Sequence, residues 1–198
     1  MSKNPNVANA IVHVNNTDRE EVAIIGGGCF WCIEPIYSDL IGVEASISGY
    51  AGGKAETADY ESVCSKTTKH VEVILIRFDP QVVSYEEILQ IFFSVHDPTT
   101  PNRQGNDSGP QYRSAIFYTD ERQKEIAEKV IKDFAPSLHD DPIVTELLPF
   151  SPFYPAEDYH QDYFNKVGDR NPYCNFVIKP KVSKFRKSFA GRLKSNQT

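Results

Sequence analysis

The residues best suited to chemistry are two cysteines in the run GGGCFWC at residues 26–32. An apolar segment precedes this run and apolar residues at helical spacing follow it, so we predict a strand, a glycine turn and a helix. That order places Cys29 at or near the first helical turn, where free N–H groups and the helix dipole stabilise a thiolate. Cys29 is therefore a candidate nucleophile. The alternative is a buried structural cysteine behind a tight turn.

Two aromatic residues follow Cys29 directly. Trp31 is the only tryptophan in the chain, and Phe30 precedes it. They could simply pack in the core, or they could form an aromatic wall beside the sulfur, which suits a methyl or thioether group. Adjacent residues do not share one helix face, and this favours a wall at the helix start.

A carboxyl group in an apolar strand supplies an independent indication. Residues 70–78 (HVEVILIRF) are β-branched and apolar on both faces, which predicts a central strand. Desolvation would disfavour the charged form of Glu72, which makes it a candidate general acid. The alternative is a position at the solvent edge or beside a lysine. One predicted face carries Glu72, Ile74, Ile76 and Phe78, and the other carries Val71, Val73 and Leu75.

A polar loop with glycines, GNDSGPQYRS at residues 105–114, enters another predicted strand. Loops that enter strands often carry site residues. Asp107 and Tyr112 could supply hydrogen bonds to a site, or they could belong only to the chemistry of a turn.

Composition limits the class of protein. The chain has 198 residues, 40% hydrophobic and 24% charged, which fits one globular domain and excludes collagen-like, coiled-coil and wholly disordered chains. The net charge of -6 argues against binding to nucleic acid, and no apolar run approaches the ~20 residues that span a bilayer. Residues 1–20 are polar and resemble a loose tail without a signal peptide, so we expect a cytoplasmic protein.

Strands and helices alternate along the chain, which favours parallel neighbours joined by crossovers. Two βαβ units of this size predict an α/β two-layer sandwich with a ferredoxin-like split βαβ core. Ser84 and Glu87 form a capping box. From residue 149 we expect long loops that wrap the sandwich. The predicted strands cover 21–25, 43–50, 70–78, 114–118 and 143–148, and later helices cover 85–95, 121–134 and about 157–167.

The chain resembles the peptide methionine sulfoxide reductase A family from about residue 22 to residue 190. The resemblance rests on seven ordered motifs, far apart in the chain. They are GCFWC at 28–32, GYAGG at 49–53, YESVCS at 60–65, HVE at 70–72, HDP at 96–98, GNDSGPQYRSAI at 105–116 and AEDYHQDY at 156–163. The resemblance implies the same ferredoxin-like fold, with a tail at 1–20, one catalytic domain at 21–190 and a tail at 191–198.

The resemblance also implies roles. Cys29 matches the catalytic cysteine, and Glu72 matches the acid that protonates the sulfoxide oxygen. Phe30 and Trp31 match the pocket for the substrate methyl group, Tyr60 and Tyr112 match the hydroxyls that bind the oxygen, and Asp107 matches a supporting carboxylate. The implied reaction reduces the S epimer of methionine sulfoxide and leaves a sulfenic acid on Cys29.

A second thiol must then condense with the sulfenic acid to give a disulfide. Cys174 matches the C-terminal resolving cysteine of many members, and we favour it. Cys32 is the alternative, because C-x-x-C at a helix start is a workable redox pair. Cys64 is expected to be structural. The resemblance implies thioredoxin as the reductant, no cofactor and no metal, and nothing in the sequence demands more than a monomer.

Two other classes remain open from the residues alone. A thiol–disulfide oxidoreductase of thioredoxin type also uses C-x-x-C near a βαβ pattern, but it would not need Glu72 or the tyrosines. A zinc-binding module could use the four cysteines, but structural zinc usually takes paired C-x-x-C knuckles and only one such pair is present.

Overall fold

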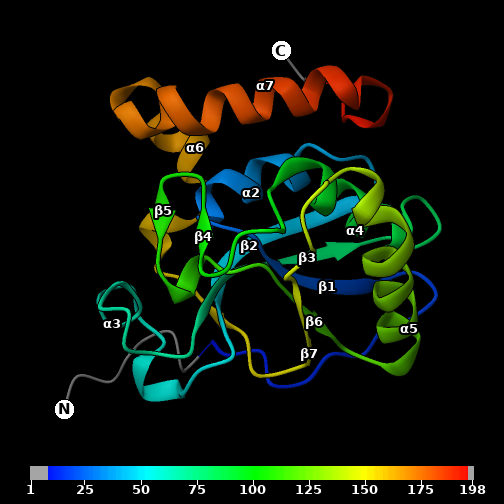
Figure 1. The fold of residues 1–198 in the computed structure, drawn as a ribbon, viewed down its shortest axis with the longest axis horizontal. Coiled ribbons are helices and arrows are strands. Elements are labelled where there is room, and N and C mark those ends of the chain that lie inside the picture. Colours follow the sequence, from blue (N-terminus) through cyan, green and yellow to red (C-terminus); the bar gives the residue numbers. More distant parts are fainter. Residues whose placement is uncertain (1–8, 196–198) are drawn as a thin grey trace.

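A six-stranded sheet runs through the middle of the computed structural model, which describes residues 9–195 (Figure 1). Its strands lie in the order β7-β6-β1-β3-β2-β8, so β1 and β3 are at the centre. These two strands carry predicted site residues at or just beyond their ends. The strands are β1 (Glu21–Gly26), β2 (Val43–Ala51), β3 (Val71–Phe78), β6 (Ala115–Tyr118), β7 (Glu146–Pro149) and β8 (Tyr154–Pro155).

The inner four strands, in the order β6-β1-β3-β2, are each antiparallel to their neighbours. The crossover from β1 to β2 leaves a gap of one strand, and β3 fills it. This is the split βαβ arrangement, so the predicted ferredoxin-like fold is confirmed. The expectation of parallel neighbours is wrong for this core, because strands joined by a helix here are separated by a third strand. Of the described strand pairs, only β6 and β7 are parallel.

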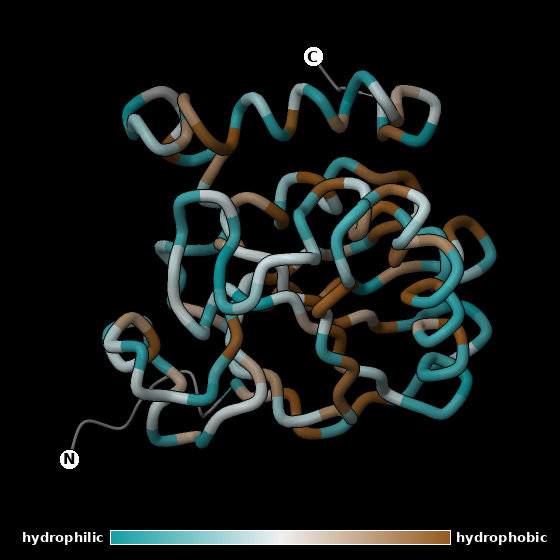
Figure 2. Tube along the Cα trace, viewed as in Figure 1, coloured by the Kyte–Doolittle hydropathy of each residue, from teal (hydrophilic) through white to brown (hydrophobic). Residues whose placement is uncertain are grey.

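One face of the sheet is covered by helices α2 (Phe30–Ser38), α4 (Tyr85–Val95) and α5 (Glu121–Lys129). The predicted capping box opens α4, where the Ser84 hydroxyl accepts from the Glu87 N–H. The predicted helix over 121–134 is confirmed, with a π-helical last turn at Val130–Phe134. Figure 2 shows apolar chain through the middle of the molecule and hydrophilic residues along the outer side of α5.

The other face of the sheet is covered mainly by loops. Phe153 is fully buried against Val71, Val73 and Leu75, and Ile11 packs beside them. Glu72's predicted neighbours Ile74, Ile76 and Phe78 lie in the helix-side core, so the predicted two faces of β3 are confirmed. The expected wrapping loop is found around Phe150 and Phe153, whereas most of the chain from residue 163 to residue 192 is helical.

The C-terminal part adds a layer that the sequence reasoning missed. A π-helical turn at Cys174–Ile178 leads into helix α7 (Lys179–Ser188), which packs on the outer side of α2 (Figure 1). The predicted helix at 157–167 is broken into a 3-10 turn, Asp158–His160, and α6 (Tyr163–Val167). A short helix α3 (Tyr60–Cys64) and a small hairpin of β4 (Arg103–Gln104) and β5 (Asp107–Ser108) were also not predicted.

The described parts of the two expected tails lie against the domain. Ile11 forms a β-bridge with Phe153, and Leu193 forms one with Leu40. Asn16 donates to Thr119 and accepts from the N–H of β1 residue 22. Residues 1–8 and 196–198 of those tails lie outside the described residues. Within 9–195, every helix falls short of the length and apolar character that a bilayer crossing requires.

The end of β1 approaches β3 so closely that it admits only glycine. A Cβ atom on Gly26 would lie 2.6 Å from the backbone oxygen of Glu72 and 2.7 Å from a methyl group of Val71. Gly26→Ala should therefore lower the free energy of unfolding by about 1–3 kcal/mol, as overpacking does. Urea unfolding of both proteins measures this. Gly191→Ala is the matched control, since a Cβ there meets nothing within 4 Å, and equal losses in both variants would contradict the account.

Candidate active site

The turn between β1 and α2 places Cys29 as predicted. Gly28 adopts a φ of +96°, where side chains are strained, and a Cβ there would also meet the Gln104 side chain. Cys29 is the N-cap residue of α2, with an extended ψ of 127°, and it is 8% exposed. Its sulfur therefore lies at the start of a helix and beside the sheet, with a small opening to solvent.

Cys32 lies one helical turn along and is hydrogen-bonded to Cys29. Burial raises the pKa of Cys29 well above its usual range, and Cys32 and Glu72 add to this. The pKa of Cys32 is lowered to about 7, because the Cys29 thiol donates to it and the charge of Lys181 stabilises its thiolate. The lower pKa of the pair thus belongs to Cys32, and not to Cys29 as the helix-start argument predicts.

Glu72 lies on the central strand, 2% exposed, and not at a solvent edge. Its Oε2 accepts a hydrogen bond from the backbone N–H of Phe30, at 3.2 Å, so the carboxyl group touches the helix start beside Cys29. Burial raises the pKa of Glu72 to about 8, and the Phe30 N–H only partly offsets this. A carboxyl group in this state carries a proton at neutral pH and can donate it.

Two tyrosines predicted from the resemblance lie near these groups. Tyr60 is the first residue of α3 and Tyr112 ends a 3-10 turn before β6. Burial raises the pKa of both phenols, and the charges of Glu72 and Cys29 add to the shift in each case. Both hydroxyls therefore stay protonated and can donate hydrogen bonds to an oxygen atom in the site.

Asp107, on β5, is held by a residue that the sequence reasoning missed. The hydroxyl of Tyr173 donates to Asp107 Oδ2 at 2.6 Å, and it lies 3.7 Å from the Cys32 sulfur. A hollow of about 320 Å³ opens here. Its lining combines the two thiols with polar and aromatic groups from the hairpin and from the C-terminal segment: Cys29, Cys32, Gln104, Gly105, Asn106, Asp107, Tyr173, Phe176, Val177 and Lys181.

The two aromatic residues after Cys29 take different positions. Phe30 is buried, whereas the Trp31 indole is stacked on Tyr163, with ring centroids 3.8 Å apart. Trp31 Nε1 donates to His160 Nδ1 at 3.1 Å, which fixes the indole ring. His160 is fully buried, and burial lowers its pKa to about 4, so it is neutral and can accept this bond.

Glu157 connects this aromatic cluster to the tyrosines. Its carboxylate accepts from the Tyr50 hydroxyl at 3.0 Å and from the Tyr60 backbone N–H at 2.9 Å. His160 Nε2 faces the same carboxylate at 3.7 Å. Both residues belong to the AEDYHQDY run, which carried the resemblance without any assigned role; that run was the signal that could have identified them.

The remaining cysteines lie apart from the hollow's lining. Cys174 is 1% exposed in the helix-side core, in the π-helical turn before α7, and Cys64 is half-buried at the end of α3, hydrogen-bonded to Tyr60. None of the four cysteines, all within the described residues, is in a disulfide. Among the residues that the structure describes, no group of three or more His, Cys, Asp or Glu side chains could hold a metal ion.

Comparison with known proteins places this geometry in a family. The family model described as peptide methionine sulfoxide reductase matches residues 21–193. The chain is 54% identical over 169 residues to peptide methionine sulfoxide reductase MsrA from Sulfolobus acidocaldarius, covering 85% of this chain and 95% of that protein. It is 52% identical to a protein of the same name from Thermus thermophilus, covering 88% of this chain and 98% of that protein.

Solved structures agree with the fold. The reduced form of Mxr1 from Saccharomyces cerevisiae is 30% identical, with a TM-score of 0.72, covering 81% of this chain and 92% of that one. Methionine sulfoxide reductase A of Corynebacterium diphtheriae is 34% identical, with a TM-score of 0.66 and 77% coverage of each chain. Mxr1 has also been solved in complex with Trx2; that chain is 22% identical, with a TM-score of 0.51, covering 76% and 88%.

The thiol pair should ionise once in the neutral range. We expect one thiolate per molecule to appear with a midpoint near pH 7, since the pKa of Cys32 is lowered to about 7. The ultraviolet absorbance of thiolate, followed against pH, measures it. Cys32→Ser should remove this step and Cys174→Ser should keep it. Survival of the step in Cys32→Ser would assign the charge to another thiol and contradict the account.

Proposed function

This chain belongs to the peptide methionine sulfoxide reductase family, and from that premise we propose that it reduces methionine S-sulfoxide, free or in proteins, to methionine. The reaction would repair oxidised proteins. One observation carries the proposal: a buried carboxyl group with its pKa raised to about 8, Glu72, lies against the helix start that holds the Cys29 thiol. Thiol–disulfide exchange, by contrast, has no substrate oxygen that needs a proton.

In the first step the Cys29 sulfur attacks the sulfoxide sulfur, while Glu72 donates its proton to the sulfoxide oxygen. Tyr60 and Tyr112 donate hydrogen bonds to the same oxygen as charge develops on it. The hydroxyl oxygen is then transferred to the Cys29 sulfur, while the substrate's sulfur–oxygen bond and the new sulfur–sulfur bond break, so that methionine leaves and Cys29 becomes a sulfenic acid. Methionine is reduced by two electrons and Cys29 is oxidised by two. The thiol proton of Cys29 replaces the one that Glu72 gave up.

The aromatic wall supports recognition of the thioether end of the substrate. Phe30 and the fixed Trp31 ring would offer apolar and sulfur–aromatic contacts to the substrate methyl group, and the hydrogen-bonded pair Asp107 and Tyr173 lines the hollow beside the thiols. A site that contacts the substrate methyl group on one side and donates hydrogen bonds to the sulfoxide oxygen on the other would accept only one configuration at the chiral sulfur. The family resemblance implies the S epimer.

A second thiol then displaces water from the sulfenic acid and forms a disulfide. The resemblance favours Cys174 for this step, and that assignment stays a prediction. The hydrogen bond between Cys29 and Cys32 favours Cys32, since its thiolate is already in contact and a thiolate is the attacking form. Cys174, buried in the core, would need its segment to move first.

A dithiol reductant must then open the disulfide by exchange. We propose a thioredoxin, as the resemblance implies; the yeast relative Mxr1 has been solved with Trx2. We further propose that the protein acts as a monomer in the cytoplasm.

Racemic methionine sulfoxide, incubated with the protein and dithiothreitol, tests the function. We expect loss of the S epimer alone, stopping at about half conversion, with the R epimer left over on chiral chromatography. Cys29→Ser is the control that should show no conversion. No conversion by folded, reduced protein, together with rapid reduction of insulin, would instead favour a general thiol–disulfide oxidoreductase.

Single-turnover and recycling rates separate the two candidate thiols. With Cys32 as the resolving residue, Cys32→Ser should give about one methionine per molecule and then stop with thioredoxin, whereas Cys174→Ser should cycle. The measurement is methionine released against time with thioredoxin and its reductase. The reverse pattern would assign the step to Cys174. Cys64→Ser is the matched control and should cycle in either case.

A further inference from the structure

The C-terminal segment is basic although the whole chain is acidic. The net charge of the chain is -6, yet residues 170–198 contain eight lysines and arginines and no aspartate or glutamate. Much of this charge lies on α7, beside the hollow that holds the thiols. A positive region beside the active site of an acidic protein raises the local concentration of negative groups.

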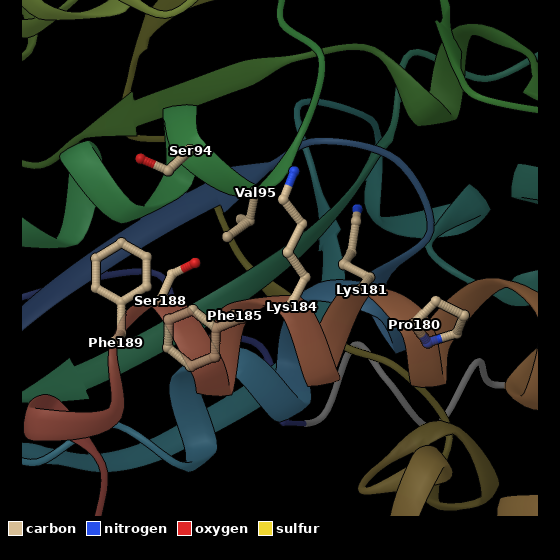
Figure 3. Close-up of a pocket in the computed structure, with 8 residues that line it drawn as sticks. All are labelled: Ser94, Val95, Pro180, Lys181, Lys184, Phe185, Ser188 and Phe189. Carbon is tan, nitrogen blue, oxygen red and sulfur yellow. The ribbon is translucent and has the colours of Figure 1, made fainter.

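A groove runs between α7 and the end of α4, with a volume of about 510 Å³ (Figure 3). Its floor is apolar, and two lysine side chains rise along it from α7, side by side, with their nitrogen atoms toward the same end. The lining residues are Ser94, Val95, Pro180, Lys181, Lys184, Phe185, Ser188 and Phe189.

Neither Lys181 nor Lys184 forms an ion pair or a hydrogen bond within residues 9–195. By contrast, Arg186 pairs with Asp39 and Arg192 pairs with Glu87 in the same segment. The paired arginines attach the segment to the body of the protein. The charge of Lys184 is available to a ligand in the groove, and Lys181, which also stabilises the Cys32 thiolate, lies beside it.

The groove lies next to the catalytic hollow, because Lys181 lines both. Phe176, at the edge of the hollow, is 82% exposed, which is unusual for a phenylalanine in a monomer. An exposed aromatic ring, Phe176, and two lysines, Lys181 and Lys184, thus lie along the segment from the thiols to α7. This surface is larger than a single amino acid needs.

We propose that the groove between α7 and α4 binds the chain next to the methionine sulfoxide in a protein substrate, and that Lys181 and Lys184 select an acidic residue there. The inference rests on the proposed function and names the substrate class of that same site. The carboxylate would pair with the two ammonium groups, while Phe185 and Phe189 contact the neighbouring apolar atoms.

The dimensions of a helix and of an extended peptide indicate how far the acidic residue should lie from the methionine sulfoxide. Lys184 lies three residues beyond Lys181, about 4.5 Å along the helix axis, and an extended peptide advances about 3.3 Å per residue. Positions one to four residues from the methionine sulfoxide span this length of the groove and are therefore the positions at which to place an acidic residue. The pairing is exposed to solvent, so the preference should be a few-fold and should weaken with salt.

Short blocked peptides with one methionine S-sulfoxide test this, with glutamate or glutamine placed on either side. Dithiothreitol is the reductant, so that no partner protein is present. We expect kcat/KM about three- to fivefold higher for the glutamate peptide on one side, falling toward one at high salt. Lys184→Glu should abolish or reverse this ratio, Lys184→Arg should keep it, and Lys187→Gln, on the same helix but outside the groove, should keep it.

Four results would overturn the proposal. Equal rates for the two peptides, with good turnover of both, would remove the subsite and leave the proposed function intact. Loss of the preference in Lys187→Gln as much as in Lys184→Glu would show a diffuse field and no subsite. An effect of Lys184→Glu only on thioredoxin-driven cycling would assign the groove to the reductant. If the parent turns over neither peptide nor free methionine sulfoxide, the proposed function fails, and the subsite with it.

Discussion

The contact between the Glu72 carboxyl group and the Phe30 N–H is the constraint on which the site depends. It joins the central strand β3 to the first turn of α2, so the acid and the Cys29 thiol approach one another without a flexible connection. The glycine turn and the close approach at Gly26 make this contact possible, since a Cβ atom there would push the strands apart. Burial at the same point keeps the carboxyl group neutral.

The chain after residue 150 supplies side chains that orient the site residues carried by the sheet and by α2. Its Glu157 and His160 orient Tyr60 and Trp31, and its Tyr173 connects Asp107 to the Cys32 thiol. These residues are more than 60 positions from their partners. The fold therefore places a rigid acid and thiol on the ferredoxin-like core and lets the C-terminal segment supply the walls and the charge around them.

Local patterns in the sequence correctly predicted features that depend on neighbouring residues alone. The period of two on β3 predicted its two faces and the burial of Glu72, and the Ser84–Glu87 pair predicted the start of α4. Parallel neighbours were wrongly expected, because the position of β3 between β1 and β2 depends on long-range pairing. The pKa of Cys32 is lowered first by the hydrogen bond from Cys29 and then by the charge of Lys181, 149 positions away, and a helix-start argument considers neither.

The central claim is that a neutral carboxyl group lies beside the thiol at neutral pH. The infrared difference spectrum between the parent and Glu72→Gln, recorded at pH 7, tests it most directly. We predict a band of a protonated carboxyl group that is lost in the variant and that shifts to carboxylate as the pH rises through about 8. A difference spectrum that contains only carboxylate bands at pH 7 would contradict the account.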